Sequence, residues 1–152
     1  LKGKHIMSES LHYLLMTDHL MVQKSLITSV KDTGLTSGQP KVLDYLKNHD
    51  GAVQKDIAIN CHIEPASLTT ILNGMENKGY ITRNICTQNR KYLNVHLTKL
   101  GWKYVERLEK EFAKIENLAL KTFTDTEKEQ LIFLLEKLYD NLSEIRKEGT
   151  TK

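Results

Sequence analysis

Residues 81–97 limit the possible folds of this chain more than any other segment, because two strand-like runs flank a polar turn there in an otherwise helical pattern. The runs Ile81–Cys86 and Tyr92–Leu97 hold β-branched and aromatic residues, and a short polar connection between such runs predicts a β-hairpin. Three short helical segments come before it, at about residues 36–47, 53–61 and 65–78. The sequence therefore predicts a mainly α fold with a small β-hairpin.

Longer helical segments enclose this middle region on both sides. Apolar residues recur at helical spacing over about residues 8–31 and again over about residues 100–123. A last helix is expected over about residues 124–145, opened by a capping box of Thr124 and Glu127. This helix is apolar around most of its circumference and should be buried on most sides. Its cover is either the rest of the chain or a partner chain, and we favour a partner because long terminal helices commonly form dimers.

Local signals set the ends of the middle helices. Thr36 and Gln39 have the spacing of a capping box, and Pro40 falls in the first turn, where its missing N–H costs least. Pro65 suits the start of the helix over 65–78, and Gly79 suits its end. These signals predict a tight turn between two short helices, followed directly by the hairpin.

Positive charge is concentrated in one segment of the chain. The 22 Lys and Arg against 19 Asp and Glu give a net charge of only +3, which decides little. Residues 77–105, however, contain six Lys or Arg and no acidic residue, whereas residues 106–148 carry eleven acidic and eight basic side chains. An acid-free basic hairpin beside paired short helices predicts a surface that faces anions.

The helices over 53–61 and 65–78 form a candidate helix-turn-helix, whose second helix would enter the major groove of DNA. The polar side chains of that second helix that point away from its apolar stripe are Ser67, Thr69, Thr70 and Asn73. Hydroxyl groups bind phosphates or bases, and Asn can pair with adenine. Taken alone, these residues are better explained as the solvent face of a helix.

The hairpin changes that balance. Arg90 and Lys91 stand at its tip without an acidic neighbour, and a cationic wing tip suits the minor groove, where phosphates line both walls. Lys55 near the start of the helix over 53–61, Arg83 at the base of the wing and Lys99 after it are further candidates for phosphate contacts. We therefore interpret residues 35–100 as a DNA-binding lobe.

The stretches LTSGQ, IEPASLTTILNGMENKGYITR and NRKYLNVHLTKLG resemble the MarR family of winged helix-turn-helix transcriptional regulators, over about residues 35–101. The resemblance implies a winged helix-turn-helix core flanked by long N- and C-terminal dimerisation helices. It further implies a homodimer that binds a pseudo-palindromic double-stranded operator and represses genes, and that leaves DNA when a small ligand binds or a cysteine is oxidised. This chain differs from the family at Asn89, where Asp usually precedes the basic pair, and at Thr70 and Gly74, which often hold Arg.

On this basis the chain divides into residues 1–6, interpreted as a non-native remnant ahead of Met7, residues 7–34 as an N-terminal dimerisation helix, residues 35–100 as the winged lobe and residues 101–148 as C-terminal dimerisation helices.

The resemblance also implies a place for an effector. A small aromatic ligand would lie between the first helix and the lobe, with His12, Tyr13 and His19 as candidate contacts. Cys86, in a wing strand beside a basic turn, is a candidate redox thiol, because positive neighbours favour the thiolate. Cys61 is interpreted as a small buried apolar residue.

Other classes of function find little support in the sequence. No apolar run approaches the roughly 20 residues that span a bilayer, and the start lacks a signal-peptide core, so we expect a cytoplasmic protein. His12 and His19 lie about 10 Å apart along a helix, too far to share a metal ion. Glycine-rich phosphate loops and nucleophile motifs are missing, so we expect neither a cofactor nor an enzyme. Two alternatives stay open: a winged-helix protein-interaction module without DNA, and a cysteine-based redox-sensing regulator.

Overall fold

The computed structural model of the chain describes residues 9–87 and 89–149, with side chains described as far as residue 145. The expectation for residues 1–6 lies outside the described residues. Two compact units make up the chain, one up to Ile115 and one from Glu116 onward.

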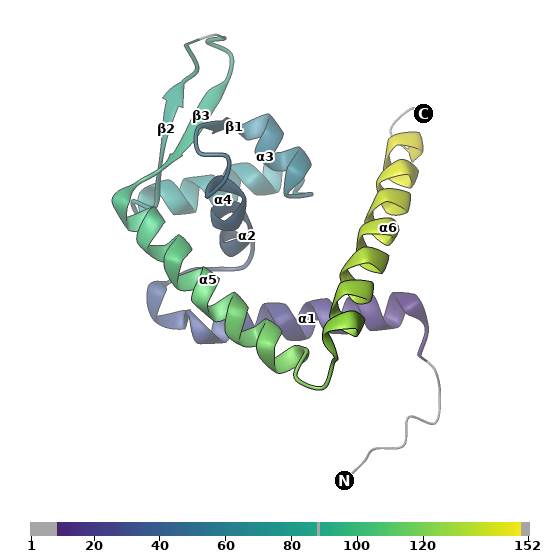
Figure 1. Cartoon of the computed structure of the whole chain (residues 1–152). Coiled ribbons are helices and arrows are strands. Elements are labelled where there is room, and N and C mark those ends of the chain that lie inside the picture. Colours follow the sequence, from purple (N-terminus) through teal and green to yellow (C-terminus); the bar gives the residue numbers. More distant parts are fainter. Residues whose placement is uncertain (1–8, 88, 150–152) are drawn as a thin grey trace. The chain divides into compact units, whose positions relative to one another are not determined.

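The first unit contains most of the secondary structure (Figure 1). In chain order its elements are α1 (Leu11–Ser29), the 3-10 turn η1 (Lys31–Thr33), α2 (Gln39–Leu46), β1 (Ala52–Val53), α3 (Gln54–Asn60), α4 (Pro65–Asn77), β2 (Ile81–Ile85), β3 (Leu93–Leu97) and α5 (Lys99–Ala119), which continues into the second unit. The second unit contains α6 (Asp125–Gly149). A mainly α fold with a small amount of β structure is thus confirmed.

The β structure is a three-stranded antiparallel sheet rather than a simple hairpin, with strand order β1-β3-β2. The predicted hairpin forms β2 and β3, with Ile81 opposite Leu97 and Arg83 opposite Val95. The prediction missed β1, whose residues Ala52 and Val53 pair with β3. It placed Ala52 in a loop and Val53 at the start of a helix. A strand of two residues is too short to show an alternating pattern. Its start depends instead on Gly51, which has a φ of +83° and donates its N–H to the Val95 carbonyl at 2.8 Å.

Apolar residues of α2, α3, α4, the sheet and α5 share one core. The largest fully buried side chains are Leu43, Leu46, Ile57, Leu68, Leu72, Met75, Ile81 and Leu108. On α4 the buried residues Leu68, Leu72 and Met75 recur at helical spacing, and Ile71 is half-buried and packs against the cluster. Gly74 in mid-helix also has a packing reason, because a Cβ there would lie 3.2 Å from Nε2 of the buried Gln39.

The end of α4 follows from Gly79. This residue adopts a φ of +73°, a left-handed conformation that favours glycine, and donates its N–H to the Glu76 carbonyl at 2.9 Å. The next residue, Tyr80, donates its N–H to the Met75 carbonyl at 2.9 Å. This pair of bonds is a Schellman motif, which satisfies the last carbonyls of the helix and turns the chain into β2.

The two predicted capping boxes have different outcomes. At α6 both halves form: Glu127 N–H donates to Thr124 Oγ1 at 3.3 Å, and Thr124 N–H donates to Glu127 Oε2 at 2.7 Å. At α2 the side chain of Gln39 accepts from Thr36 N–H at 3.1 Å, but Gly38 is the N-cap residue and Pro40 follows in the first turn. The prediction at α2 was therefore right about Gln39 and wrong about which residue caps the helix.

The long helices α1 and α6 carry apolar side chains that their own units leave exposed. On α1 the exposed fractions reach 64% at Met16 and 60% at Leu20 and Met21. On α6 the large exposed residues are Ile132, Phe133, Leu134, Leu135, Tyr139, Leu142 and Ile145. No helix among residues 9–87 and 89–149 is long and apolar enough to cross a membrane.

Candidate nucleic-acid interface

The turn between α3 and α4 brings the two helices together as predicted for a helix-turn-helix. His62 adopts a φ of +51°, and Ile63 donates its N–H to the Ala58 carbonyl at 3.0 Å, so the chain reverses within a few residues. Cys61 closes α3 with a side chain that is only 1% exposed, which confirms its interpretation as a buried apolar residue. Burial raises the pKa of its thiol. Pro65 is the first residue of α4, as expected.

The polar face of α4 is exposed, as the sequence predicts. Ser67, Thr69, Thr70 and Asn73 all lie on the solvent side of the helix. The Thr69 hydroxyl donates to the Pro65 carbonyl at 3.0 Å, and the Thr70 hydroxyl donates to the Ala66 carbonyl at 3.4 Å. Because a hydroxyl has one donor hydrogen, both threonines keep only their acceptor lone pairs for an outside partner in this geometry.

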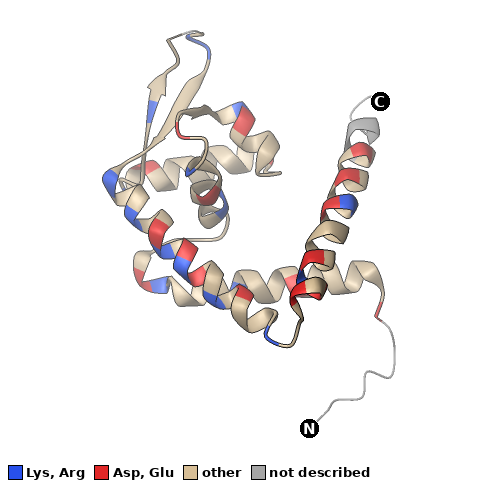
Figure 2. Cartoon of the chain, viewed as in Figure 1, with Lys and Arg blue, Asp and Glu red and all other residues tan. Residues whose placement is uncertain are grey.

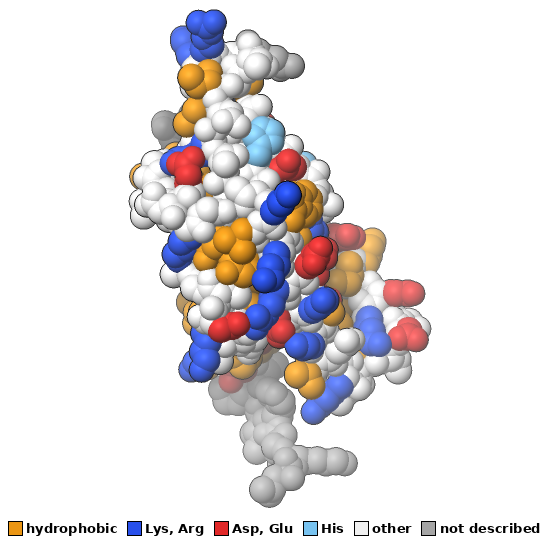
Figure 3. Space-filling view, turned by 90° about the vertical axis from the view of Figure 1, so that its left-hand side faces the viewer, with side chains coloured by type: hydrophobic (Ala, Val, Ile, Leu, Met, Phe, Trp, Pro, Cys, Tyr) orange, Lys and Arg blue, Asp and Glu red, His pale blue; other side chains and the backbone are white. Residues whose placement is uncertain are grey.

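The wing formed by β2, β3 and the turn between them ends in two free cations. Arg90 and Lys91 are exposed, and among the described residues neither forms an ion pair. Figure 2 shows the basic tip of this turn, and the face drawn in Figure 3 shows Lys and Arg side chains there without an acidic neighbour. Asn89 shapes the turn: its Oδ1 accepts from Lys91 N–H, and its carbonyl accepts from Tyr92 N–H, each at 3.0 Å. Asn89 thus fixes the backbone that carries the two cations.

The base of the wing differs, because Arg83 has an acidic partner. Its Nε donates to Glu76 Oε2 at 3.1 Å, and its backbone N–H donates to Glu76 Oε1 at 3.2 Å. A third bond runs from Arg83 Nη2 to Asn73 Oδ1 at 2.7 Å. The hydrogen bond from Arg83 is the main reason that the pKa of the Glu76 carboxyl lies below its usual value. Arg83, a candidate for phosphate contacts, is therefore paired within the chain, because Glu76 stands one residue outside the acid-free stretch.

The other candidate cations are exposed at the starts of helices. Lys55 is the second residue of α3 and lines a shallow apolar pocket of about 400 Å³ together with Ile59, Pro65 and Thr69. Lys99 is the first residue of α5. Lys78, just after α4, instead donates to the Gly34 carbonyl at 2.5 Å, so its ammonium is engaged within the chain.

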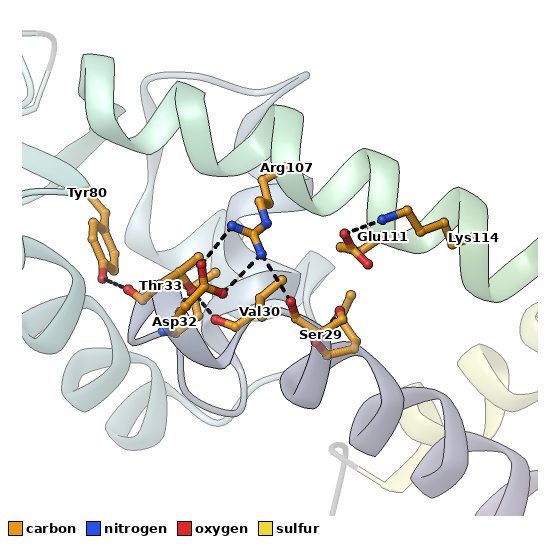
Figure 4. A network of polar contacts seen from close by, with 10 residues as sticks. Ser29, Val30, Asp32, Thr33, Tyr80, Arg107, Glu111 and Lys114 are labelled. Atoms are coloured by element: carbon orange, nitrogen blue, oxygen red, sulfur yellow. Dashed lines mark hydrogen bonds and ion pairs between the residues drawn. The ribbon is translucent and has the colours of Figure 1, made fainter.

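A polar network joins η1, the segment between α4 and β2, and α5 (Figure 4). The Tyr80 hydroxyl donates to the Thr33 carbonyl at 2.7 Å. Arg107 of α5 binds both carboxylate oxygens of Asp32, at 2.9 and 3.0 Å, and its Nη2 also donates to the Ser29 carbonyl at 3.2 Å. The bond from Arg107 is the main cause that lowers the pKa of Asp32. This network is not evident from the sequence, because its members lie up to 78 residues apart.

The remaining candidates do not join this interface. His12, Tyr13 and His19 are exposed on α1, where His12 Nε2 lies 3.3 Å from Ser10 Oγ. Cys86 follows β2 and is 9% exposed, so the structure adds no support for its role as a redox thiol, which needs an accessible sulfur. No cluster of metal-ligating side chains occurs in the part of the chain that the structure describes.

Comparisons with known proteins agree with this geometry. The model of the MarR family matches residues 35–92. The transcriptional repressor YetL of Bacillus subtilis (strain 168) is 27% identical over 114 residues, which cover 72% of this chain and 67% of YetL.

Solved structures share the fold. S. aureus MepR in complex with DNA is 26% identical with a TM-score of 0.78, covering 88% of this chain and 96% of MepR. A crystal structure of MarR has a TM-score of 0.83 at 20% identity, covering 93% of this chain and 96% of MarR. The match to the family model falls on the lobe, and the match to the solved structures covers most of the chain. Residues 35–92 of this chain match the MarR family, and the chain shares the fold of MarR and MepR over most of its length.

Proposed function

We propose that this protein binds double-stranded DNA as a homodimer and represses transcription, with α4 in the major groove and the wing tip at the minor groove. The observation that carries the proposal is the pair Arg90 and Lys91, exposed and without an ion pair among the described residues, at the tip of a wing whose strand β2 contacts α4, the helix with the exposed polar face. Free cations beside a groove-sized helix are suited to a polyanionic backbone. Relatives support it, since YetL is named a repressor and MepR has been solved with DNA.

The structure suggests how the contacts divide. Ser67, Thr69, Thr70 and Asn73 are assigned to base edges and nearby phosphates in the major groove, because they are the exposed polar residues of α4. Lys55 and the wing tip are assigned to phosphates, and Arg83 is assigned mainly to holding the wing against α4. Since α4 has no basic residue, the wing supplies a large share of the affinity.

The homodimer is part of the proposal and rests on α1 and α6. Both helices expose rows of large apolar side chains, and exposed apolar surface on this scale marks an interface with another protein. A second copy is the partner that matches a two-fold operator with half-sites about one helical turn apart. Sedimentation of the full chain at micromolar concentration should show a dimer, and a monomer would remove the two-lobed complex from the proposal.

Salt titration separates DNA binding from the alternative of a protein-interaction module. DNA fragments bound by the full chain are first selected from a random pool, and the affinity for them is then measured by fluorescence anisotropy over a range of salt concentrations. Phosphate contacts predict that log K falls linearly with log salt, with a slope of about −0.9 for each phosphate neutralised. Failure to select any DNA, or an affinity that does not respond to salt, would contradict the proposal.

Release by a small aromatic effector and a location in the cytoplasm complete the proposal. His12, Tyr13 and His19 on α1 are the candidate effector contacts. Salicylate, a simple aromatic acid, serves as the probe: it should weaken DNA binding by the unchanged chain, and weaken it less after Tyr13→Ala. A regulator of transcription acts where the DNA is, which in a bacterial cell is the cytoplasm, and the protein is proposed to act by binding rather than by catalysis.

A further inference from the structure

The side chain of Asn73 is held in one orientation by its neighbours. It lies three residues before Glu76 on α4, so both project from the same face of the helix. Arg83 of β2 reaches across to this face, where its guanidinium donates to Glu76 Oε2 through Nε and to Asn73 Oδ1 through Nη2. The side chain of Arg83 is only 15% exposed, so the strand and helix hold it in place.

The direction of the Asn73 amide follows from the chemistry of this contact. A guanidinium group has five N–H donors and no acceptor, so only the amide oxygen of Asn73 can face it. The distance of 2.7 Å from Nη2 to Oδ1 is that of a strong, charge-assisted hydrogen bond. Because Asn73 itself is exposed, the group that it presents outward is its NH2, which carries two donors.

This orientation changes what Asn73 can recognise. The usual pairing of Asn with adenine needs the amide oxygen to accept from N6 while the amide nitrogen donates to N7. Arg83 takes one lone pair of Oδ1 and turns the NH2 outward, so the outward face of Asn73 presents mainly donors. Two donors match guanine, which offers the acceptors O6 and N7, and one matches O4 of thymine, whereas adenine offers only N7 beside its N6 amino donor and cytosine offers the N4 amino donor.

We propose that Arg83 is a positioning residue that makes Asn73 selective for a keto base, guanine or thymine, in the major groove of the operator. The inference rests on the DNA binding proposed above and adds to it the type of base that Asn73 recognises. It also gives Arg83 a function at the interface that needs no net charge, since Glu76 neutralises it. The proposal predicts a keto base at the position where the residue type alone suggests adenine.

A binding matrix tests the proposal. The operator selected by the unchanged chain is synthesised with every base pair replaced in turn, and the affinity of each DNA is measured for the unchanged protein and for Asn73→Ala. The base pair at which Asn73→Ala loses discrimination is the one that Asn73 contacts. The unchanged protein should prefer a keto base there, by about fivefold to tenfold over adenine or cytosine.

Two variants at Arg83 then separate positioning from simple structure. Arg83→Met keeps the apolar stem but removes every donor, and Arg83→Lys keeps a charge for Glu76 but lacks the fork that reaches both neighbours. Either variant frees the Asn73 oxygen, so the preference at that base pair should shift toward adenine, and a merely structural role would lower affinity for all bases equally. Asn73→Asp, which has no amide donor, should abolish the keto preference.

The outcomes are distinguishable. Selective DNA binding in which the Asn73-dependent base is adenine or cytosine, in which no base depends on Asn73, or in which both Arg83 variants keep the keto preference overturns this inference and leaves DNA binding intact. If the unchanged chain binds no DNA at all, both proposals fail. Circular dichroism of each variant checks folding, and the Arg83→Lys protein keeps the test available if Arg83→Met does not fold.

Discussion

The tip and the base of the wing use the same kind of side chain in opposite ways. At the tip, Arg90 and Lys91 stand in solvent without an acidic partner among the described residues. At the base, Arg83 is mostly buried and shares its donors between Glu76 and Asn73. All three belong to one acid-free stretch of sequence, so the difference arises only on folding. A cation is available to a ligand when the fold leaves it unpaired, and local charge counts do not show this.

The largest effect expected from this comparison is on DNA affinity. Arg90→Ala removes an unpaired, exposed cation, so the affinity for selected DNA should fall by at least about tenfold, the value of one charge-assisted contact. Thermal stability should change little, because an exposed side chain without partners contributes within about 0.5 kcal/mol. Lys110→Ala, which removes an exposed cation from α5, is the matched control. Binding by the Arg90 variant at the unchanged level would remove the wing tip from the interface.

The salt dependence of binding should separate tip from base. Arg90→Ala loses one phosphate contact, so the slope of log K against log salt should become shallower by about 0.9. The double change Arg83→Met with Glu76→Gln replaces a neutral ion pair by two neutral side chains and should leave the slope where it was. Anisotropy titrations at four or more salt concentrations measure both. Equal slopes for the two variants would contradict the division into a free tip and a neutralised base.

Folding stability should show the reverse order. Arg83→Met breaks the clamp between β2 and α4 and should lower the free energy of unfolding by about 1 kcal/mol, a modest value because the Glu76 side chain is 38% exposed. For a chain of this size the corresponding drop in melting temperature is roughly 2–4 °C. Arg90→Ala, measured alongside by calorimetry, should melt with the unchanged protein. A larger loss for the tip variant would show that the tip has a structural partner.

The smallest effect concerns pH. The pKa of Glu76 is lowered in the folded protein from its ordinary value near 4.5, chiefly by the hydrogen bond from Arg83. The stability that this carboxylate contributes is therefore present above pH 4.5 and is lost as the pH falls through the folded-state pKa. Denaturant unfolding of Glu76→Gln at pH 7 and near pH 3.5 should show a stability deficit that shrinks at the lower pH. Arg90→Ala has no such titrating partner and should follow the unchanged protein at both values.

Most of the fold can be predicted from the sequence, because its signals are local. Apolar spacing places the helices, and Gly79 marks the end of α4 through a backbone conformation that few other residues adopt. Strand β1 escapes prediction, since two residues carry no period and owe their pairing to β3, about 40 residues away. The hydrogen bond between Gln39 and Thr36 was predicted correctly, but the N-cap residue of α2 is Gly38 and not Thr36.

The candidate interface divides in the same way. Exposure of Ser67, Thr69, Thr70 and Asn73 follows from helical spacing, and the hairpin pattern places Arg90 and Lys91 in its turn. The clamp on Arg83 does not, because it depends on how closely the strand returns to the helix that precedes it. Asn89 stands where the family usually has Asp, and the structure shows its side chain bonded to the backbone of the turn. Tertiary contacts decide which polar atoms stay available to a ligand, and the spacing of residues along the sequence does not predict these contacts.

The network around η1 has a mechanical consequence. Tyr80, just after α4, bonds to Thr33, and Arg107 of α5 bonds to Asp32. These contacts hold α4 and α5 to the turn η1 that follows α1, so α1 and α4 are rigidly connected. In the proposed dimer, this rigid connection would mean that the contact between the two α1 helices sets the distance between the two lobes. The protein would then recognise the spacing of the two half-sites as well as their sequence. An operator with one base pair added between its half-sites should not be bound.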